Sequence, residues 1–210
     1  MKIAESANAW KKRYTPIKEW DRMFSEGRWD YLDSIGEAAR YALIAGYIHR
    51  RPSVNDVLDV GCGAGILIRY LDRSRIRYRG IDLSQAAIDQ ARERFPHDRF
   101  DAIDLASYEP ASGELFDAIV FNEVLPHIDD PLGSFSRYCN YLRPHGIVII
   151  STFQNPNPSS NAAMFTALLD EAVAAGDLIV LTRSEVTTSE KGLKWRVDVL
   201  AGDHEPRADG

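Results

Sequence analysis

The chain carries three alternating glycines in the stretch from Leu58 to Gly65, directly after a run of apolar residues. An apolar run, a glycine-rich turn and a helical stretch in this order predict a strand that turns sharply into a helix. Alternate glycines let a ligand approach the backbone of the turn, because no side chain stands in the way. The amides that begin the expected helix, from Ala64 onward, favour an anionic group at the same place. The sequence therefore predicts a nucleotide-type binding site at this turn.

The residues around the turn distinguish between two kinds of nucleotide ligand. A dinucleotide fingerprint needs glycine or alanine at the place of Ile66, and its pyrophosphate would lie close to the carboxylate of Asp59. This disfavours an NAD-dependent oxidoreductase, which stays as an alternative function. Asp82 ends the next apolar run and Asp104 follows the third, where we expect a ribose and an adenine ring respectively. Three carboxylates at successive strand ends suit a ligand that donates hydrogen bonds and carries no phosphate.

Short apolar runs alternate with helical stretches after Pro52, which is typical of repeated strand-helix-strand units around a parallel sheet. The expected strands are Val54–Val60, Ile76–Asp82, Arg99–Ile103, Phe116–Asn122 and Gly146–Phe153. The expected helices are Ser34–Arg50, with Ser34 as N-cap, Ala64–Asp72, Gln85–Phe95, Pro131–Leu142 and Asn161–Ala175. Alternating residues predict an antiparallel hairpin at the end of the chain, from Leu178–Thr188 and Leu193–Leu200.

The composition is that of a soluble globular protein, with 45% hydrophobic and 27% charged residues. A net charge of −6 disfavours binding to nucleic acids and to anionic membranes, which attract basic proteins. The longest apolar run, 146–150, is far shorter than the roughly 20 residues of a membrane span. With no secretory signal and two cysteines, Cys62 and Cys139, we expect reduced thiols and a cytoplasmic location. The sequence carries no signal for an oligomeric state.

Several motifs occur together in the order found in one known family. They are Leu58–Gly65, Asp82, Asp104, Phe116–Val120 and Leu142–Gly146. In combination they resemble the class I S-adenosylmethionine-dependent methyltransferases, over about residues 54–152. The chain departs from the family pattern at His145, where the family usually has the first of two glycines. The resemblance implies an α/β fold, a Rossmann-like three-layer sandwich with a seven-stranded, mostly parallel sheet, an antiparallel last strand and an N-terminal helical cap.

The resemblance also implies how the motif residues hold S-adenosylmethionine. The methionine part would lie against Asp59 and the glycine turn, and the ribose hydroxyls against Asp82. Asp104 and Leu105 would border the adenine, and Asn122 the transferable methyl group. The full set of residues expected to bind this cofactor is Asp59, Gly61, Cys62, Gly63, Gly65, Asp82, Leu83, Asp104, Leu105, Asn122 and Glu123.

The segment Asn122–His127 follows the fourth expected strand, at the edge of the sheet where such folds place their ligands. His127 is the candidate base for a hydroxyl acceptor. Glu123 is the second catalytic candidate, as a base or as a group that positions an amine. The remaining histidines show no metal-ligand spacing, so we expect no metal.

The first 33 residues are rich in aromatic side chains and predict a cap on a methyltransferase domain at 34–200, which a flexible tail at 201–210 follows. In the resembling family such a segment often closes over the cofactor, so Tyr14, Trp29 and Tyr31, with His127, are expected to line the acceptor pocket. The chain lacks the Pro-Pro-aromatic loop that follows the fourth strand in nucleic-acid amino-methyltransferases. We therefore expect methylation of an O or N atom of a small molecule, such as a sugar, an amine or a secondary-metabolite intermediate. A non-catalytic module that binds S-adenosylmethionine is the remaining alternative.

Overall fold

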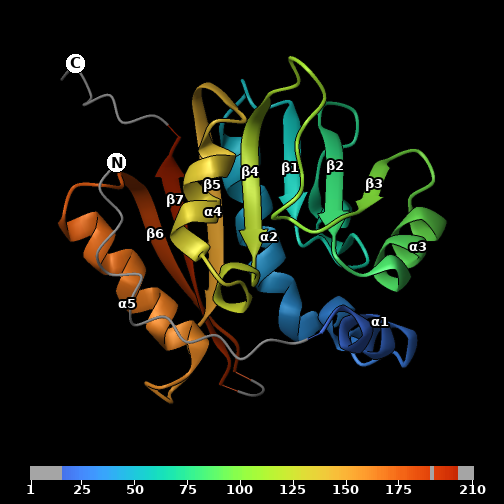
Figure 1. Cartoon of the computed structure of the whole chain (residues 1–210), viewed down its shortest axis with the longest axis horizontal. Helices are drawn as coiled ribbons and strands as arrows, with labels where there is room; N and C mark the ends of the chain where they lie inside the picture. The colour runs from blue at the N-terminus through green and yellow to red at the C-terminus, as the bar shows by residue number, and fades with distance from the viewer. Residues whose placement is uncertain (1–15, 190–191, 203–210) are drawn as a thin grey trace.

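The computed structural model describes residues 16–189 and 192–202 and contains one seven-stranded sheet in the order β3-β2-β1-β4-β5-β7-β6 (Figure 1). Only β7 runs antiparallel to its neighbours β5 and β6, and the other strand pairs are parallel. The expected mostly parallel sheet with an antiparallel last strand is confirmed. The strands are β1 Asp56–Val60, β2 Arg77–Asp82, β3 Arg99–Ala102, β4 Phe116–Asn122, β5 Leu142–Phe153, β6 Val180–Thr187 and β7 Lys194–Ala201.

Helices cover both faces of the sheet and complete a three-layer sandwich. One apolar core joins the sheet to α2 and α3, and a second joins it to α4 and α5. Residues of β4 alternate between the two cores, with Val120 in the first and Phe121 in the second, because successive side chains of a strand point to opposite faces. The helices are α1 Ile17–Ser25, α2 Ile35–Arg50, α3 Gln85–Arg94, α4 Pro131–Cys139 and α5 Asn161–Ala174, with short 3-10 helices η2 Asp30–Asp33, η3 Ile66–Tyr70 and η4 Leu125–His127.

Two expectations about the elements were wrong. The helix expected at Ala64–Asp72 is only the short η3, because Gly65 has a left-handed backbone (φ 76°) that interrupts a continuous helix. Leu142 lies in β5, where it pairs with Phe116, and not at the end of α4. At the irregular start of β5, His145 has a φ of 64°, the conformation that a glycine adopts easily.

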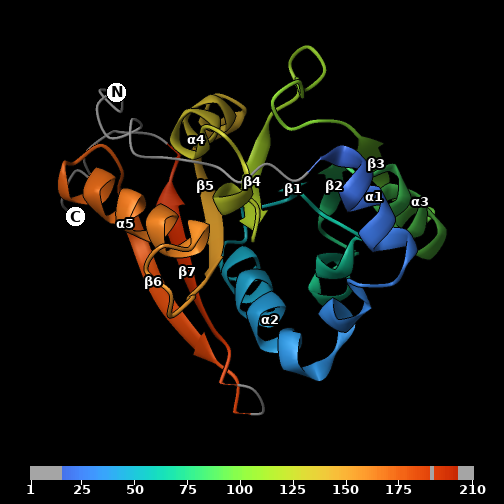
Figure 2. The same cartoon turned by 60° about the horizontal axis from the view of Figure 1, so that its bottom comes forward.

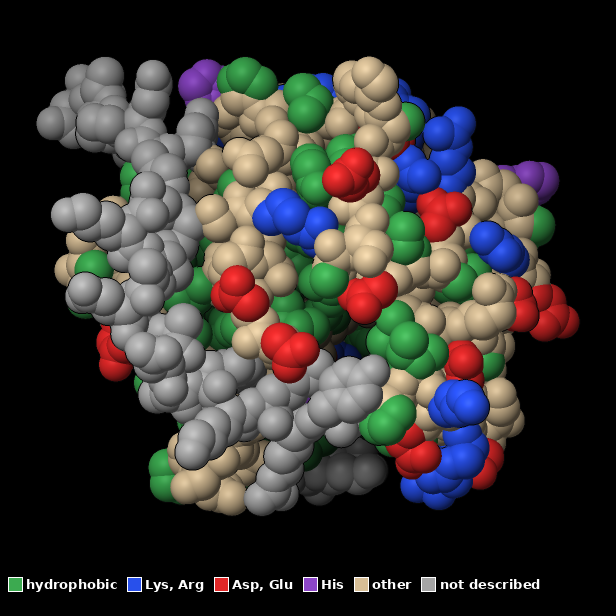
Figure 3. All heavy atoms as spheres, in the orientation of Figure 1, with side chains coloured by type: hydrophobic (Ala, Val, Ile, Leu, Met, Phe, Trp, Pro, Cys, Tyr) green, Lys and Arg blue, Asp and Glu red, His purple; other side chains and the backbone are tan. Residues whose placement is uncertain are grey.

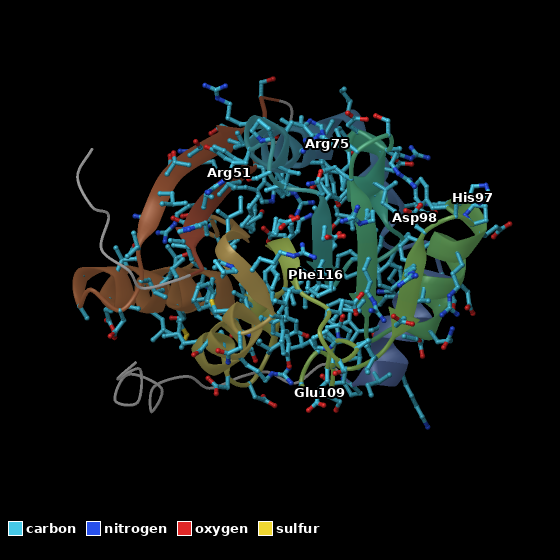
Figure 4. The ribbon with its side chains drawn as sticks, turned by 90° about the horizontal axis from the view of Figure 1, so that it is seen from above. Arg51, Arg75, His97, Asp98, Glu109 and Phe116 are labelled. Carbon is cyan, nitrogen blue, oxygen red and sulfur yellow. The ribbon has the colours of Figure 1, made fainter. Side chains whose placement is uncertain are left out.

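The carboxyl ends of the parallel strands meet at one edge of the sheet, near α1 (Figure 2). Arg51, Arg75 and Phe116 mark the opposite edge, where strands begin (Figure 4). β7 extends to Ala201, one residue into the segment expected as a tail, and 203–210 lie outside the described residues. No helix among 16–189 and 192–202 is long and apolar enough to cross a membrane.

The packing of α5 on the sheet depends on Phe165, whose side chain is fully buried. Phe165→Ala is expected to lower the free energy of unfolding by about 3 to 5 kcal/mol, because apolar contacts are lost and the surrounding residues fill the cavity only in part. The exposed Glu171 on the same helix provides a control, and Glu171→Ala is expected to change that free energy by less than about 0.5 kcal/mol. Urea denaturation measures both. Equal losses in the two variants would contradict the described packing of α5.

Candidate active site

A cavity of about 770 Å³ lies at the carboxyl ends of the strands, a volume in the range of small-molecule sites. Figure 3 shows the face of the molecule hollowed in its lower half, where hydrophobic and acidic side chains meet. Of the residues expected in the site, Gly65 does not line the cavity, and Tyr14 lies outside the described residues. The expected residues that line it are Trp29, Tyr31, Asp59, Gly61, Cys62, Gly63, Asp82, Leu83, Asp104, Leu105, Asn122, Glu123 and His127.

The glycine turn follows β1 and is bonded to the end of β2. The amides of Gly61 and Cys62 both donate to the carbonyl oxygen of Ile81, at 2.7 and 3.0 Å. Gly61 has a φ of 70°, and a Cβ there would lie 2.3 Å from Cγ2 of Val124. Glycine at 61 is therefore required by the close approach of the segment after β4, and not only by a ligand. The turn leaves bare backbone at the cavity wall.

Asp59, in β1, is a buried carboxyl group at the wall of this cavity. Its Oδ2 accepts a hydrogen bond of 2.6 Å from the hydroxyl of Tyr78. Its Oδ1 has no hydrogen-bond partner among the described residues. Burial raises the pKa of Asp59 to about 7, against the opposing effect of the Tyr78 hydrogen bond. A buried acceptor atom without a partner fits a ligand that donates a hydrogen bond or carries a positive charge.

Asp82 is the last residue of β2, and Asp104 follows the end of β3. Asp82 accepts the amide of Gly63 at Oδ2 and the amide of Ser84 at Oδ1, both at 2.9 Å. Burial raises the pKa of Asp82, and these amide hydrogen bonds oppose the rise. Asp104 accepts the amide of Ala106 at 2.8 Å and leaves its other oxygen for further contacts. Both carboxyl groups line the cavity, so β1, β2 and β3 each bring one carboxylate to it.

Arg40 lies on α2 and lines the same cavity, although it was not among the residues expected in the site. Its side chain is only 2% exposed and donates to Glu37 at 2.8 Å and to Asn122 at 3.1 Å. The guanidinium carbon lies 4.7 Å from the ring centre of Tyr41 and 5.3 Å from that of Trp195. The sequence signal that could have indicated Arg40 was its spacing of three residues from Glu37, since both charged residues lie on an otherwise apolar helix face.

Glu123 follows β4 with an unusual backbone, since its φ of 64° is rare for a residue with a side chain. Its carboxylate accepts the Ser151 hydroxyl at 2.9 Å and the Phe153 amide at 3.0 Å. Burial raises its pKa, and the nearby Arg40 guanidinium, 3.9 Å away, opposes the rise. Two hydrogen bonds from β5 therefore hold this carboxylate in one place.

His127 ends η4 and is exposed at the cavity. Its ring meets the edge of Trp20, with ring centres 5.8 Å apart. Trp20 stacks on Trp29 at 5.7 Å, and Trp29 lies 6.0 Å from Tyr31, so an aromatic wall runs along this side of the cavity.

Helix α1 carries part of this wall and docks against α3 (Figure 2). Asp21 accepts the hydroxyl of Ser84 at 2.7 Å and the amide of Ala86 at 3.2 Å. The amide of Ser84 donates to Asp82, so Ser84 joins α1 to the carboxylate at the end of β2. Within the described ranges, no cluster of three His, Cys, Asp or Glu side chains is arranged to hold a metal ion.

Comparison with known proteins identifies the family of this fold and site. The model of a methyltransferase domain matches residues 35–204. The chain therefore belongs to this methyltransferase family, a class of enzymes that uses S-adenosylmethionine.

Curated relatives agree with this assignment over part of their length. The ubiquinone biosynthesis O-methyltransferase of Neisseria meningitidis serogroup C is 33% identical over 120 residues, which are 53% of this chain and 49% of that protein. The protein of the same name from Aromatoleum aromaticum is 29% identical over 178 residues, 80% of this chain and 65% of that protein. The chain spans about half the length of the first of these relatives.

The N-methyltransferase NodS from Bradyrhizobium japonicum, solved with S-adenosyl-L-homocysteine, shares the fold. Its TM-score is 0.71 at 20% identity, over 88% of this chain and 97% of that one.

The stability of the protein is expected to depend on the ionisation of Asp59. With a pKa raised by burial from 3.8 to about 7, the folded protein holds a proton that the unfolded chain has lost, so stability falls as the pH rises through this range. Asp59→Asn cannot ionise, so it is expected to stabilise the free protein more at pH 8 than at pH 5, by a difference of roughly 2 to 3 kcal/mol. Thermal unfolding of both proteins from pH 5 to 8 measures this. Parallel curves would contradict the raised pKa.

Proposed function

We propose that this chain transfers a methyl group from S-adenosylmethionine to an O or N atom of a small molecule. The observation that carries the proposal is that Asp59, Asp82 and Asp104 line one cavity, each from the end of a different strand. Three carboxylates and a bare glycine turn suit a ligand with a cationic sulfonium, an amino group and ribose hydroxyls, and no phosphate. The relatives named O-methyltransferases and the N-methyltransferase of the same fold support this class of reaction.

The residues present fit the methyl donor part by part. The ribose hydroxyls would lie against the carboxylate of Asp82, and the adenine against Asp104 and Leu105. The amino group of the methionine part would lie against Oδ1 of Asp59, which has no hydrogen-bond partner among the described residues. The carboxylate of that part would pair with Arg40, which alone among the described lining residues is a lysine or arginine.

When bound, S-adenosylmethionine supplies a methyl carbon whose bond to sulfur breaks, with the electron pair left on sulfur, as the acceptor atom bonds to that carbon. The protein contributes position and exclusion of water, because an in-line displacement is accelerated mainly by holding the acceptor in place. Asn122 would border the methyl group. His127 and Glu123 both follow β4 and line the cavity, and either would take a proton from the acceptor.

The acceptor is a small molecule that enters beside the aromatic wall of Trp20, Trp29 and Tyr31. A net charge of −6 and the acidic lining disfavour nucleic acids as acceptors. The free thiols of Cys62 and Cys139 are consistent with a cytoplasmic location of the protein.

A screen of candidate acceptors for formation of S-adenosylhomocysteine tests the proposal. Tight binding of the donor without turnover of any acceptor would favour a non-catalytic binding module. Binding of NAD in place of the donor would favour an oxidoreductase, although the buried Ile66 next to the turn opposes it.

The role of Asp82 is tested by Asp82→Asn, which keeps the shape of the side chain and removes its charge. We expect donor affinity to fall by about 10- to 150-fold, because hydrogen bonds to a charged acceptor contribute about 1.5 to 3 kcal/mol. Calorimetry with S-adenosylhomocysteine measures this. Asp89→Asn, an exposed carboxylate on α3 outside the cavity, is the matched control and should leave affinity unchanged. Equal affinities of the two variants would place the ribose elsewhere.

We further propose that residues 16–33, the described part of the expected N-terminal cap, form a lid that the bound donor holds closed, with the hydrogen bond from Ser84 to Asp21 fixing the closed position. Asp21→Asn weakens this bond, so amide hydrogen exchange in α1 is expected to rise and donor affinity to fall by roughly tenfold. Hydrogen exchange with and without S-adenosylhomocysteine measures both effects. Exchange in α1 that is slow in the free wild type and unaltered by the ligand would contradict a lid.

A further inference from the structure

We propose that the acceptor is an amine, which binds as an ammonium ion and passes its proton to Glu123. This inference rests on the proposed methyl transfer and deepens it by naming the chemical class of the acceptor.

The first support is the charge of the cavity. Among its described lining residues, Arg40 is the only permanent cation. Arg40 is already paired with Glu37, and the proposed donor adds its own carboxylate at this place. An anionic acceptor would therefore meet repulsion, whereas an ammonium ion meets charges of opposite sign. The carboxyl side chains that line the cavity are Glu37, Asp59, Asp82, Asp104, Glu123, Asp129 and Asp130.

The second support is the way in which the chain holds Glu123. A left-handed backbone at a residue with a side chain is costly and persists only where neighbouring bonds enforce it. Here the Glu123 amide donates to the Ser151 carbonyl at 3.1 Å, and the Ser151 hydroxyl and Phe153 amide both donate to the carboxylate. These bonds fix a carboxylate at the end of β4, next to the place proposed for the methyl group.

The third support is the charge that each kind of acceptor develops during the reaction. A hydroxyl acceptor becomes more negative as it loses its proton, and this charge would lie near Glu123 and Glu37. An amine is a cation when it binds, is neutral when it attacks and becomes a cation again as the new bond forms. The carboxylates oppose the negative charge of a hydroxyl acceptor and stabilise the positive charge of an amine acceptor.

The aromatic wall also favours an amine as the acceptor. Trp20 and Trp29 stack on each other, and Tyr31 is 49% exposed at the cavity. The faces of such rings attract ammonium groups and their carbon substituents. We therefore expect an amine that also carries an apolar or aromatic group.

The protons balance in the proposed step. The bound ammonium gives one proton to the Glu123 carboxylate and keeps a lone pair on nitrogen. That lone pair forms the bond to the methyl carbon, and the product leaves as a methylated ammonium ion. Glu123 then releases its proton to water and returns to the carboxylate form.

The test compares three probes of matched size, namely benzylamine, benzyl alcohol and benzoate. Each is titrated into the full chain saturated with S-adenosylhomocysteine, and ligand-observed NMR measures the dissociation constants. We expect benzylamine to bind at least about tenfold more tightly than benzyl alcohol and benzoate. Equal binding, or tighter binding of the alcohol or the acid, would overturn the proposal.

Two variants test whether the preference for benzylamine depends on Glu123. Glu123→Gln is expected to abolish the tenfold advantage of benzylamine, whereas Asp89→Asn, which removes an exposed charge outside the cavity, is expected to keep it. A preference that survives in Glu123→Gln would overturn the role of Glu123. Since the wild-type comparison requires no variant, the acceptor class is tested even if Glu123→Gln does not fold.

Turnover gives an independent measurement. Amines are expected to yield S-adenosylhomocysteine faster than the matched alcohols, and His127→Ala is expected to slow turnover of amines by less than tenfold. If S-adenosylhomocysteine binds and only hydroxyl compounds are methylated, the inference fails and the proposed function stands. If S-adenosylhomocysteine does not bind to the wild type, the proposed function itself fails.

Discussion

The hydrogen bonds between the turn after β1 and the end of β2 hold the site together. Through them the amides of Gly61 and Cys62 are fixed to Ile81, and the amide of Gly63 to Asp82. β1 and β2 are neighbouring parallel strands with a further strand on each side, so their ends cannot slide past each other without breaking the strand pairing. The bare backbone of the turn and two carboxylates are thereby placed at one cavity before any ligand binds.

Burial of charge is the second constraint, and it works against stability. Asp59, Asp82 and Glu123 lie where burial raises the pKa of each carboxyl group. Arg40 offsets part of this cost, because its buried guanidinium contacts Glu37 and Asn122 and lies near Glu123. Such a cluster resembles a preformed binding site more than a structural core, since apolar residues would pack there at lower cost.

Much of the fold was accessible from the sequence because the signals are local. The apolar run of β4 predicted a strand of a parallel sheet, and alternating residues predicted the terminal hairpin of β6 and β7. The short η3 and the early start of β5 at Leu142 were missed. Both depend on backbone conformations at Gly65 and His145 that hydrophobic spacing does not reveal.

The sequence by itself determined the parallel sheet, the glycine turn and the acidic residues at successive strand ends, because each is encoded within a few neighbouring residues. Only the tertiary structure decided which residues from distant parts of the chain contact the site. Arg40 and Asn122 are 82 residues apart in the chain, yet they meet because α2 packs across the sheet beside β4. Likewise, Glu123 is fixed by hydrogen bonds from β5. No local spacing encodes such contacts, since they arise from the packing of whole elements.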